Sequence, residues 1–108
     1  MSSRVDGLAI RITNGNVANS HIPIRQIAEL FPFDAFGGGN KSSAGVPIEI
    51  ILDGVGSFET DIAEDKMLLR IRSQDAVGKF YKQHGAKDGS RVFFERLGKR
   101  SFRVSVID

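Results

Sequence analysis

The chain has 108 residues, a hydrophobic fraction of 41% and a formal net charge of +2. This length fits one compact domain with one modest core. The sequence has no cysteine, which excludes a disulfide framework and a thiolate zinc site, and it has no apolar run long enough for a signal peptide or a membrane span. We therefore expect residues 1–108 to form a single cytoplasmic domain without a membrane partner.

The first half of the chain predicts a strand, an arm and a helix. Residues 8–12 (LAIRI) alternate between apolar and polar side chains, as in a half-buried strand. Residues 13–21 (TNGNVANSH) are rich in Asn and have no apolar period, so we expect a loop or arm. In residues 22–31 the apolar side chains recur at helical spacing, and Pro32 ends the helix. The apolar face of this helix contains Ile24, Ile27, Ala28 and Phe31.

The second half predicts two hairpins with a helix between them. Residues 46–53 form a buried strand, and residues 57–62 pair with residues 67–72 across a polar turn. A second helix, capped by Ser73 or Asp75, ends at Gly85. It turns Val77, Phe80 and Tyr81 inward. Residues 91–96 and 101–107 form the closing hairpin. We therefore predict a mainly β, α+β fold: a small, partly closed barrel of about six to seven strands with two short helices.

The glycine-rich segment FGGGNKSSAG (residues 36–45) suggests a phosphate-binding loop. A Walker-type loop needs a glycine directly before the lysine, where this chain has Asn40, and another at the position of Ala35. The nucleotide-binding hypothesis therefore fails. The amide, ammonium and hydroxyl groups of Asn40, Lys41 and Ser42 can still contact backbone phosphates of a nucleic acid, although a plain linker is the common alternative.

Charge is segregated along the second half of the chain. Residues 49–65 contain six acidic and no basic residues, whereas residues 66–103 contain eleven basic and three acidic residues. This pattern indicates either a basic face that meets a polyanion or two segments that cancel in adjacent strands.

Two groups of polar side chains are suited to DNA. Five polar side chains lie close together within residues 13–21. Asn can pair bidentately with adenine in the major groove. Arg70 and Arg72 alternate along one strand face, in phase with Lys66, and a ribbon of this kind fits the major groove. An ordinary solvated strand face is the alternative. The five side chains of the first group are Asn14, Asn16, Asn19, Ser20 and His21.

Two blocks of the sequence together resemble the B3-like DNA-binding pseudobarrel. The first is ITNGNVANSHIPIRQIAELFP (residues 12–32), which is similar to the strand, arm and helix at the start of that domain. The second runs from FETDI through MLLRIR to AVGKFYKQHGAKDGSRVFFER (residues 58–96), which is similar to its hairpin, short helix and closing block. The family includes domains of plant transcription factors and effector domains of restriction endonucleases of the EcoRII and BfiI kind. The glycine-rich loop is closer to the restriction-enzyme branch.

The resemblance implies a non-catalytic domain that reads double-stranded DNA through the major groove with two arms. It maps the first arm to residues 13–21, with Arg25 behind it, and the second arm to residues 59–73. It also implies a type II restriction endonuclease in a prokaryotic cytoplasm, at the nucleoid, with the catalytic domain elsewhere in the full protein. No cofactor is implied, and we expect the isolated domain to be a monomer. The predicted DNA-binding residues are Asn14, Asn16, Asn19, Ser20, His21, Arg25, Asn40, Lys41, Ser42, Asp61, Glu64, Lys66, Arg70 and Arg72.

Two other functions stay open. Glu64 and Lys66 fit the acidic-x-Lys part of a metal-dependent nuclease site, with Asp53 as a second ligand, although a polar hairpin turn has the same composition. His21 and His84 lie in no metal-ligand spacing. A small barrel that binds a protein or a sugar is the third hypothesis.

Overall fold

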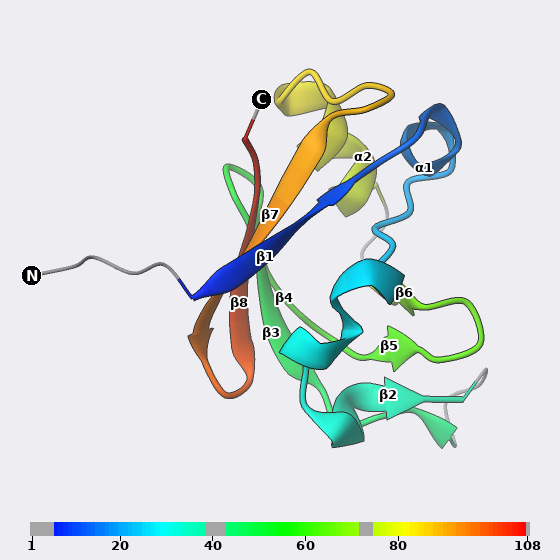
Figure 1. The fold of residues 1–108 in the computed structure, drawn as a ribbon, viewed down its shortest axis with the longest axis vertical. Coiled ribbons are helices and arrows are strands. Elements are labelled where there is room, and N and C mark those ends of the chain that lie inside the picture. Colours follow the sequence, from blue (N-terminus) through cyan, green and yellow to red (C-terminus); the bar gives the residue numbers. More distant parts are fainter. Residues whose placement is uncertain (1–5, 39–42, 72–74, 108) are drawn as a thin grey trace, which may run out of the picture.

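Two β-sheets and a few short helices make up the protein in a computed structural model that describes residues 6–38, 43–71 and 75–107 (Figure 1). The larger sheet has five strands in the order β1-β7-β8-β3-β4. Neighbouring strands in it are antiparallel except for β3 and β8, which are parallel. The strands are β1 (Gly7–Arg11), β3 (Ile48–Leu52), β4 (Gly56–Thr60), β7 (Arg91–Gly98) and β8 (Ser101–Val106).

The smaller sheet has three very short strands in the order β2-β5-β6. They are β2 (Phe36–Gly37), β5 (Ile62–Ala63) and β6 (Leu68–Leu69), and β2 is parallel to β5. The chain passes from β4 of the larger sheet to β5 of the smaller one through a single residue, Asp61. The two sheets do not close into a barrel, because β1 and β4 are the edges of the larger sheet.

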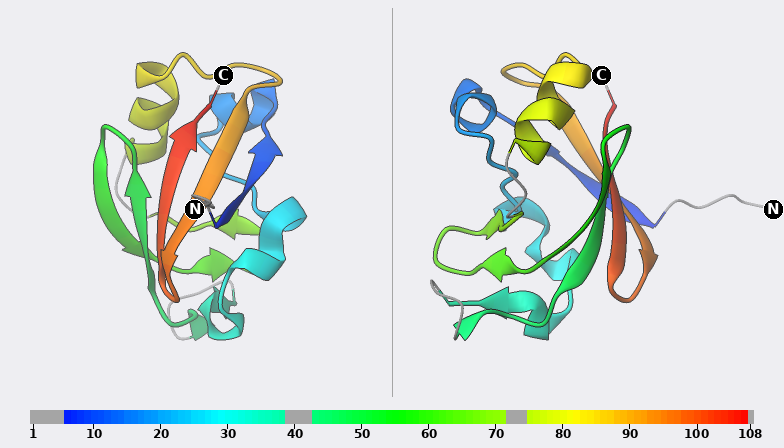
Figure 2. Two further views of the ribbon diagram at one scale, coloured as in Figure 1. Left: turned by 60° about the vertical axis from the view of Figure 1, so that its left-hand side comes forward. Right: turned by 180° about the vertical axis from the view of Figure 1, so that it is seen from behind.

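Four short helices complete the described elements. They are α1 (Asn14–Ala18), the 3₁₀ helices η1 (Arg25–Leu30) and η2 (Phe33–Ala35), and α2 (Ala76–Gln83). The right-hand view of Figure 2 shows these helices and the smaller sheet on one side of the five-stranded sheet. The core lies between these layers. No helix in the described ranges is long and apolar enough to cross a membrane.

Alternation along the strands produces this core. Ile10, Val92 and Phe94 point inward and are buried, whereas Arg11 and Arg91, which lie opposite each other in neighbouring strands, are exposed. Phe31, after η1, connects the helical layer to the sheet. Its ring contacts Phe94 edge-on, with 5.9 Å between centroids, and lies 4.8 Å from the ring of Phe102.

The mainly β, α+β class predicted from the sequence is confirmed, as are most of its elements. Strands form in all five segments of the larger sheet, and α2 buries Val77, Phe80 and Tyr81 as expected. Gly85 has φ +63° and ends that helix. Asp75 occupies the N-cap with φ +64° and makes no capping hydrogen bond with its side chain, while Ser73 lies outside the described residues.

Three local expectations were wrong in detail. Residues 14–18 form a helical turn rather than an irregular arm, because Thr13 and Asn16 form a reciprocal capping box. Residues 25–30 form 3₁₀ turns rather than an α-helix, with a kink at Ile27 (φ −128°). The predicted strand of residues 57–62 divides at Asp61. Residues before Asp61 belong to β4 of the larger sheet, and Ile62 and Ala63 form β5, which pairs with β6 in the smaller sheet.

Two phenylalanines two residues apart provide a test of this packing. Phe31 is 6% exposed and Phe33 is 96% exposed. We expect Phe31→Ala to lower the free energy of unfolding by about 3–5 kcal/mol, because it removes both ring contacts and leaves a cavity. Phe33→Ala should change it by less than about 0.5 kcal/mol. Urea unfolding of both variants measures the difference, and equal losses would contradict the described core.

Candidate nucleic-acid interface

The two predicted arms lie side by side and line one groove. This interarm groove has a volume of about 300 Å³, and its lining residues are Ser20, His21, Ala63, Asp65, Lys66, Leu68, Leu69, Arg70 and Ile71. Backbone hydrogen bonds join the two segments beside this groove. Leu69 N donates to Ile22 O at 3.1 Å, and Ile24 N donates to Met67 O at 2.8 Å. Figure 1 shows the chain after α1 running beside β6.

The first arm is held in place from inside the protein. The buried Tyr81 of α2 donates its hydroxyl hydrogen to His21 O at 2.6 Å, and His21 N donates to Asn16 O at 2.9 Å. Burial raises the pKa of Tyr81, so its hydroxyl stays a donor throughout the ordinary pH range. At the other end of the arm, Asn14 N donates to Asp88 Oδ1 at 3.1 Å. The arm is therefore a supported turn rather than a free strand of chain.

The polar side chains of the first arm divide into structural and available groups. The Asn16 amide accepts from Thr13 N at 2.9 Å, and Asn19 Nδ2 donates to Gly15 O at 2.9 Å, so both serve the helical turn. Ser20 and His21 are exposed at the mouth of the groove, and Asn14 and Arg25 are also exposed.

The second arm contains a buried ion pair that the sequence did not reveal. Arg70 Nη2 lies 2.6 Å from Asp61 Oδ2, and Arg70 Nε donates to Asp61 Oδ1 at 3.0 Å. The side chains are only 17% and 5% exposed, respectively. A forked pair of this kind fixes the orientation of both groups.

The same ion pair joins the second arm to both sides of the glycine-rich segment. Arg70 Nη1 donates to Gly38 O at 2.5 Å, and Gly45 N donates to Asp61 Oδ2 at 2.8 Å. Gly38 N also donates to Ser43 O at 2.6 Å. A Cβ at Gly37 would overlap with Gly45 N, so this close approach requires glycine there. The base of the segment is therefore closed by Asp61 and Arg70 together.

The charge of Asp61 is stabilised by these contacts. Burial raises the pKa of this carboxyl, but the hydrogen bonds from Arg70 and from Gly45 N lower it by more, so the pKa lies below its ordinary value. Asp61 is thus ionised at neutral pH although it is buried. This pair joins one residue of the acidic segment to one residue of the basic segment, and both residues lie just outside the strands.

The turn between β5 and β6 carries the remaining described candidates. Glu64, Asp65 and Lys66 are exposed there, and Met67 turns the chain with φ +53°. Lys66 lies in this turn rather than in the strand, so the expectation that it shares a strand face with Arg70 was wrong. Ser20, across the groove, also has a positive φ of +55°. Left-handed residues other than glycine are uncommon and concentrate at functional sites.

Four predicted residues lie outside the described part of the chain: Asn40, Lys41, Ser42 and Arg72. Two residues of the groove were missed by the sequence reasoning. Asp65 lines it beside Lys66, and its only sequence signal was its place in a polar turn. Tyr81 does not line the groove but holds the first arm through the hydrogen bond to His21 O, and the sequence indicated only that this side chain is buried.

The residues of the alternative nuclease site do not meet. Within residues 6–38, 43–71 and 75–107, no group of three His, Asp or Glu side chains could hold a metal ion. Asp53 lies in the β3–β4 turn, where its carbonyl oxygen is 2.7 Å from His84 Nε2 at the end of α2. Glu64 follows β5, far from that turn in Figures 1 and 2.

Comparison with models of known protein families gives no match for the chain, and comparison with curated protein sequences gives none either.

Breaking the ion pair should be costly. We expect Arg70→Met to lower the free energy of unfolding by about 2–4 kcal/mol, because it leaves the buried Asp61 carboxylate without its counter-charge. The double variant Asp61→Asn/Arg70→Met should recover much of this loss. Arg25→Met, which changes an exposed arginine, should cost less than about 0.5 kcal/mol. Chemical denaturation measures all three, and an equal cost for Arg25 and Arg70 would refute the structural role.

The lowered pKa of Asp61 predicts a specific pH dependence. Its contribution to stability should be complete above its unfolded pKa of about 4 and should be lost as the pH falls through the lower folded value. The free energy of unfolding should therefore fall more steeply below about pH 4 in the natural chain than in the double variant. Parallel slopes in the two proteins would contradict the assignment.

Proposed function

We propose that the protein binds double-stranded DNA in a sequence-specific manner through the major groove, with its two arms at the bases. One observation carries the proposal. Two segments that the sequence analysis selected separately, some 40 residues apart, supply Ser20 and His21 on one side and Lys66 and Arg70 on the other side of a single groove. Polar donors and acceptors that converge from two supported segments are suited to a ligand with many polar groups.

The groove contains the chemistry that base edges require. Ser20 and His21 offer groups that both donate and accept, Lys66 donates only, and Asp65 accepts only. A carboxylate can accept from the amino group of cytosine, and a lysine can donate to guanine or to a phosphate. Asn14 and Glu64 are exposed on the same two arms, and Arg25 is exposed in η1 after the first arm, so these side chains extend this surface. Asn19 is also exposed, but its side chain donates to Gly15 O.

Asp61 and Arg70 have a different role in this proposal. Three nitrogens of the Arg70 guanidinium already donate to Asp61 or Gly38, so a guanine contact would compete with these internal hydrogen bonds. We assign this pair to positioning: it fixes the second arm and the base of the glycine-rich segment against each other. The contacts predicted for Asn40, Lys41, Ser42 and Arg72 remain predictions from the sequence.

The wider context of the proposal comes from the sequence resemblance. A domain of this kind would supply specificity to a restriction endonuclease, with the catalytic nuclease domain elsewhere in the full protein and the prokaryotic nucleoid as its location. The interarm groove supports that role, because donor and acceptor side chains from both arms converge in it.

Selection from a randomised duplex pool, at two salt concentrations, tests the proposal directly. We expect a short sequence motif to be enriched and the affinity to fall with salt, because each phosphate contact releases counterions. Retention without enrichment would indicate a non-specific binder. No retention at low salt would overturn the proposal, and Mg²⁺-dependent cleavage that Glu64→Ala abolishes would favour the nuclease instead.

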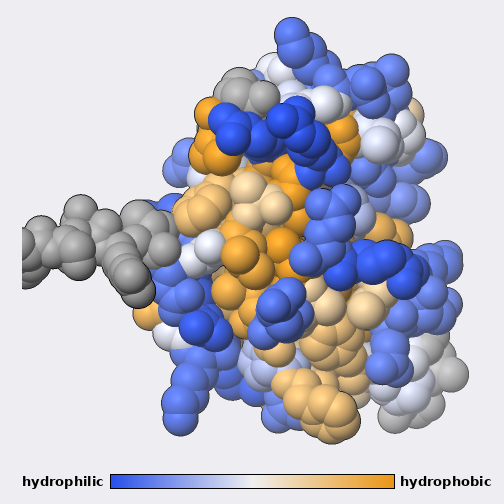
Figure 3. Space-filling model, viewed as in Figure 1, coloured by the Kyte–Doolittle hydropathy of each residue, from blue (hydrophilic) through white to orange (hydrophobic). Residues whose placement is uncertain are grey.

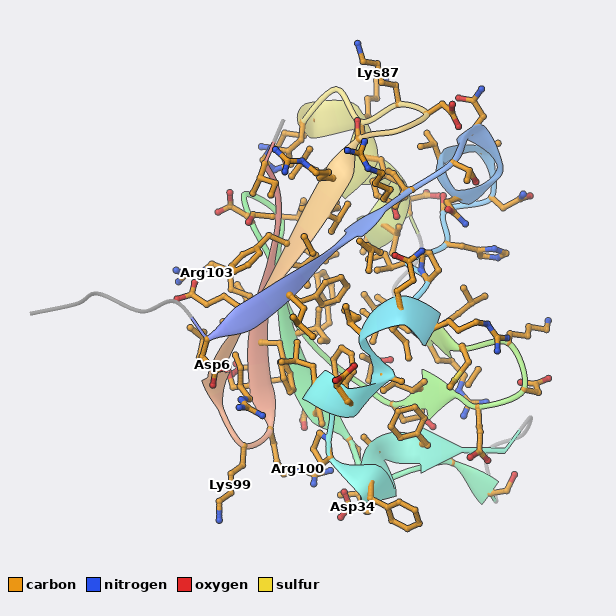
Figure 4. All side chains as sticks on the ribbon, viewed as in Figure 1. Asp6, Asp34, Lys87, Lys99, Arg100 and Arg103 are labelled. Carbon is orange, nitrogen blue, oxygen red and sulfur yellow. The ribbon has the colours of Figure 1, made fainter. Side chains whose placement is uncertain are left out.

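Single substitutions distinguish base contacts from phosphate contacts. His21→Ala should cost about 1–3 kcal/mol on the selected duplex and relax the specificity at one position. Lys66→Ala should weaken binding either in the same selective way or uniformly with a salt slope smaller by about one unit. Arg103→Ala is the matched control, because Arg103 of β8 is exposed on the side of the large sheet away from the two arms (Figure 4). Fluorescence anisotropy measures the affinities. If Arg103→Ala weakens binding as much as the groove variants, the interarm groove is not the DNA-binding site.

A further inference from the structure

A large aromatic side chain stands exposed at the end of the molecule away from α2. Phe33 of η2 is 96% exposed, and Val46 and Leu97 are exposed in the neighbouring segment and hairpin. Figure 3 shows apolar side chains on the surface around η2. Isolated exposed apolar residues are common, but an exposed group of them beside a hollow is typical of an interaction surface.

This aromatic side chain is presented on a fixed base. Arg100 Nη1 donates to Asp34 Oδ1 at 2.7 Å, next to Phe33 in the chain, and Arg100 Nη2 donates to Val46 O at 2.8 Å. Val46 N in turn donates to Asp34 O at 2.8 Å. Figure 4 shows Asp34 and Arg100 side by side at this end of the molecule. Because η2 is already held in place, binding would cost little conformational entropy there, which favours Phe33 as a central residue of an interface.

A hollow lies directly beside Phe33. It has a volume of about 580 Å³, and Phe31, Pro32 and Phe33 are among the residues that line it. Glu29 of η1 lines it, as do Arg96 and Lys99 of the β7–β8 hairpin, and Arg96 is ion-paired with Asp6 at 2.8 Å. Glu29 and Lys99 are both exposed, so side chains of opposite charge line the hollow.

The exposed Phe33 side chain of one copy of the chain can enter the adjacent hollow of a second copy. In a two-fold interface each residue of one copy meets the partner residues that meet it in return. If Phe33 of each copy enters the hollow of the other, the Glu29 side of one copy faces the Lys99 side of its partner. The apolar contact and the charge contact are then satisfied by the same rotation.

We propose that this surface, which we call the Phe33 surface, is the interface of a two-fold symmetric dimer of the chain. The proposal is independent of DNA binding, because the Phe33 surface shares no lining residue with the interarm groove. It replaces the expectation of a strict monomer. We expect the dimer to be weak and to form as the protein concentration rises.

Sedimentation velocity of the 108-residue chain, from about 1 µM to about 1 mM, provides the first measurement. The average mass should rise from the 11.8 kDa monomer towards twice that value. Phe33→Asp should weaken dimerisation by about tenfold or more, because it removes the central apolar contact. The core does not contain Phe33, so an unchanged unfolding curve should confirm that the variant is folded.

Charge reversal identifies the geometry. Glu29→Lys and Lys99→Glu should each weaken the dimer severalfold, and the double variant should restore it, since the opposed pair is re-formed with reversed signs. Ile107→Ser is the control, because Ile107 is exposed to a similar degree as Leu97 but lies at the C-terminal end of the chain. A chain that stays monomeric at the highest concentration, an Ile107→Ser variant as weak as Phe33→Asp, or a double reversal without recovery would each overturn the proposal.

Discussion

The ion pair between Asp61 and Arg70 is the contact on which the rest of the candidate site depends. Asp61 is the single residue that connects β4 of the larger sheet to β5 of the smaller sheet. Arg70 directly follows β6. Together they hold β5, β6 and the two ends of the glycine-rich segment with four hydrogen bonds. A buried carboxylate is unfavourable unless it is paired and hydrogen-bonded, and here both conditions are met. The pair therefore adds to the burial of Ile62 and Leu69 and to the backbone hydrogen bond from Leu69 N to Ile22 O in fixing these short strands.

Periodicity was sufficient to predict α2 and the strands that form the larger sheet, because burial in those elements follows simple alternation or a helical face, but it did not indicate how these strands are ordered. It failed where local hydrogen bonds decide the conformation. The Thr13–Asn16 capping box makes a helical turn from a segment without apolar period, and a single left-handed residue, Met67, removes Lys66 from the strand phase.

The candidate site was predictable in its location but not in the roles of its residues. Both arms were selected for their polar side chains, and both line the groove. Alternation along a strand predicts opposite faces for neighbouring residues, whereas the bend between the sheets buries Thr60 and Asp61 in succession. No sequence pattern distinguishes an arginine that reads a base from one that neutralises a buried carboxylate, since that depends on a partner nine residues away. The support of His21 by Tyr81 was hidden for the same reason, across 60 positions.

The position of β8 determines how the chain can fold. This last strand is central in the sheet, where it joins the β1–β7 half to the β3–β4 half through its parallel contact with β3. The β3–β4 and β7–β8 hairpins are local and can form quickly, but their union must close a loop of about fifty residues. Until a ribosome has produced residues 101–106, the edge of β3 that pairs with β8 in the folded protein has no partner. That interval is when a nascent chain of this topology is most exposed to aggregation and most dependent on chaperones.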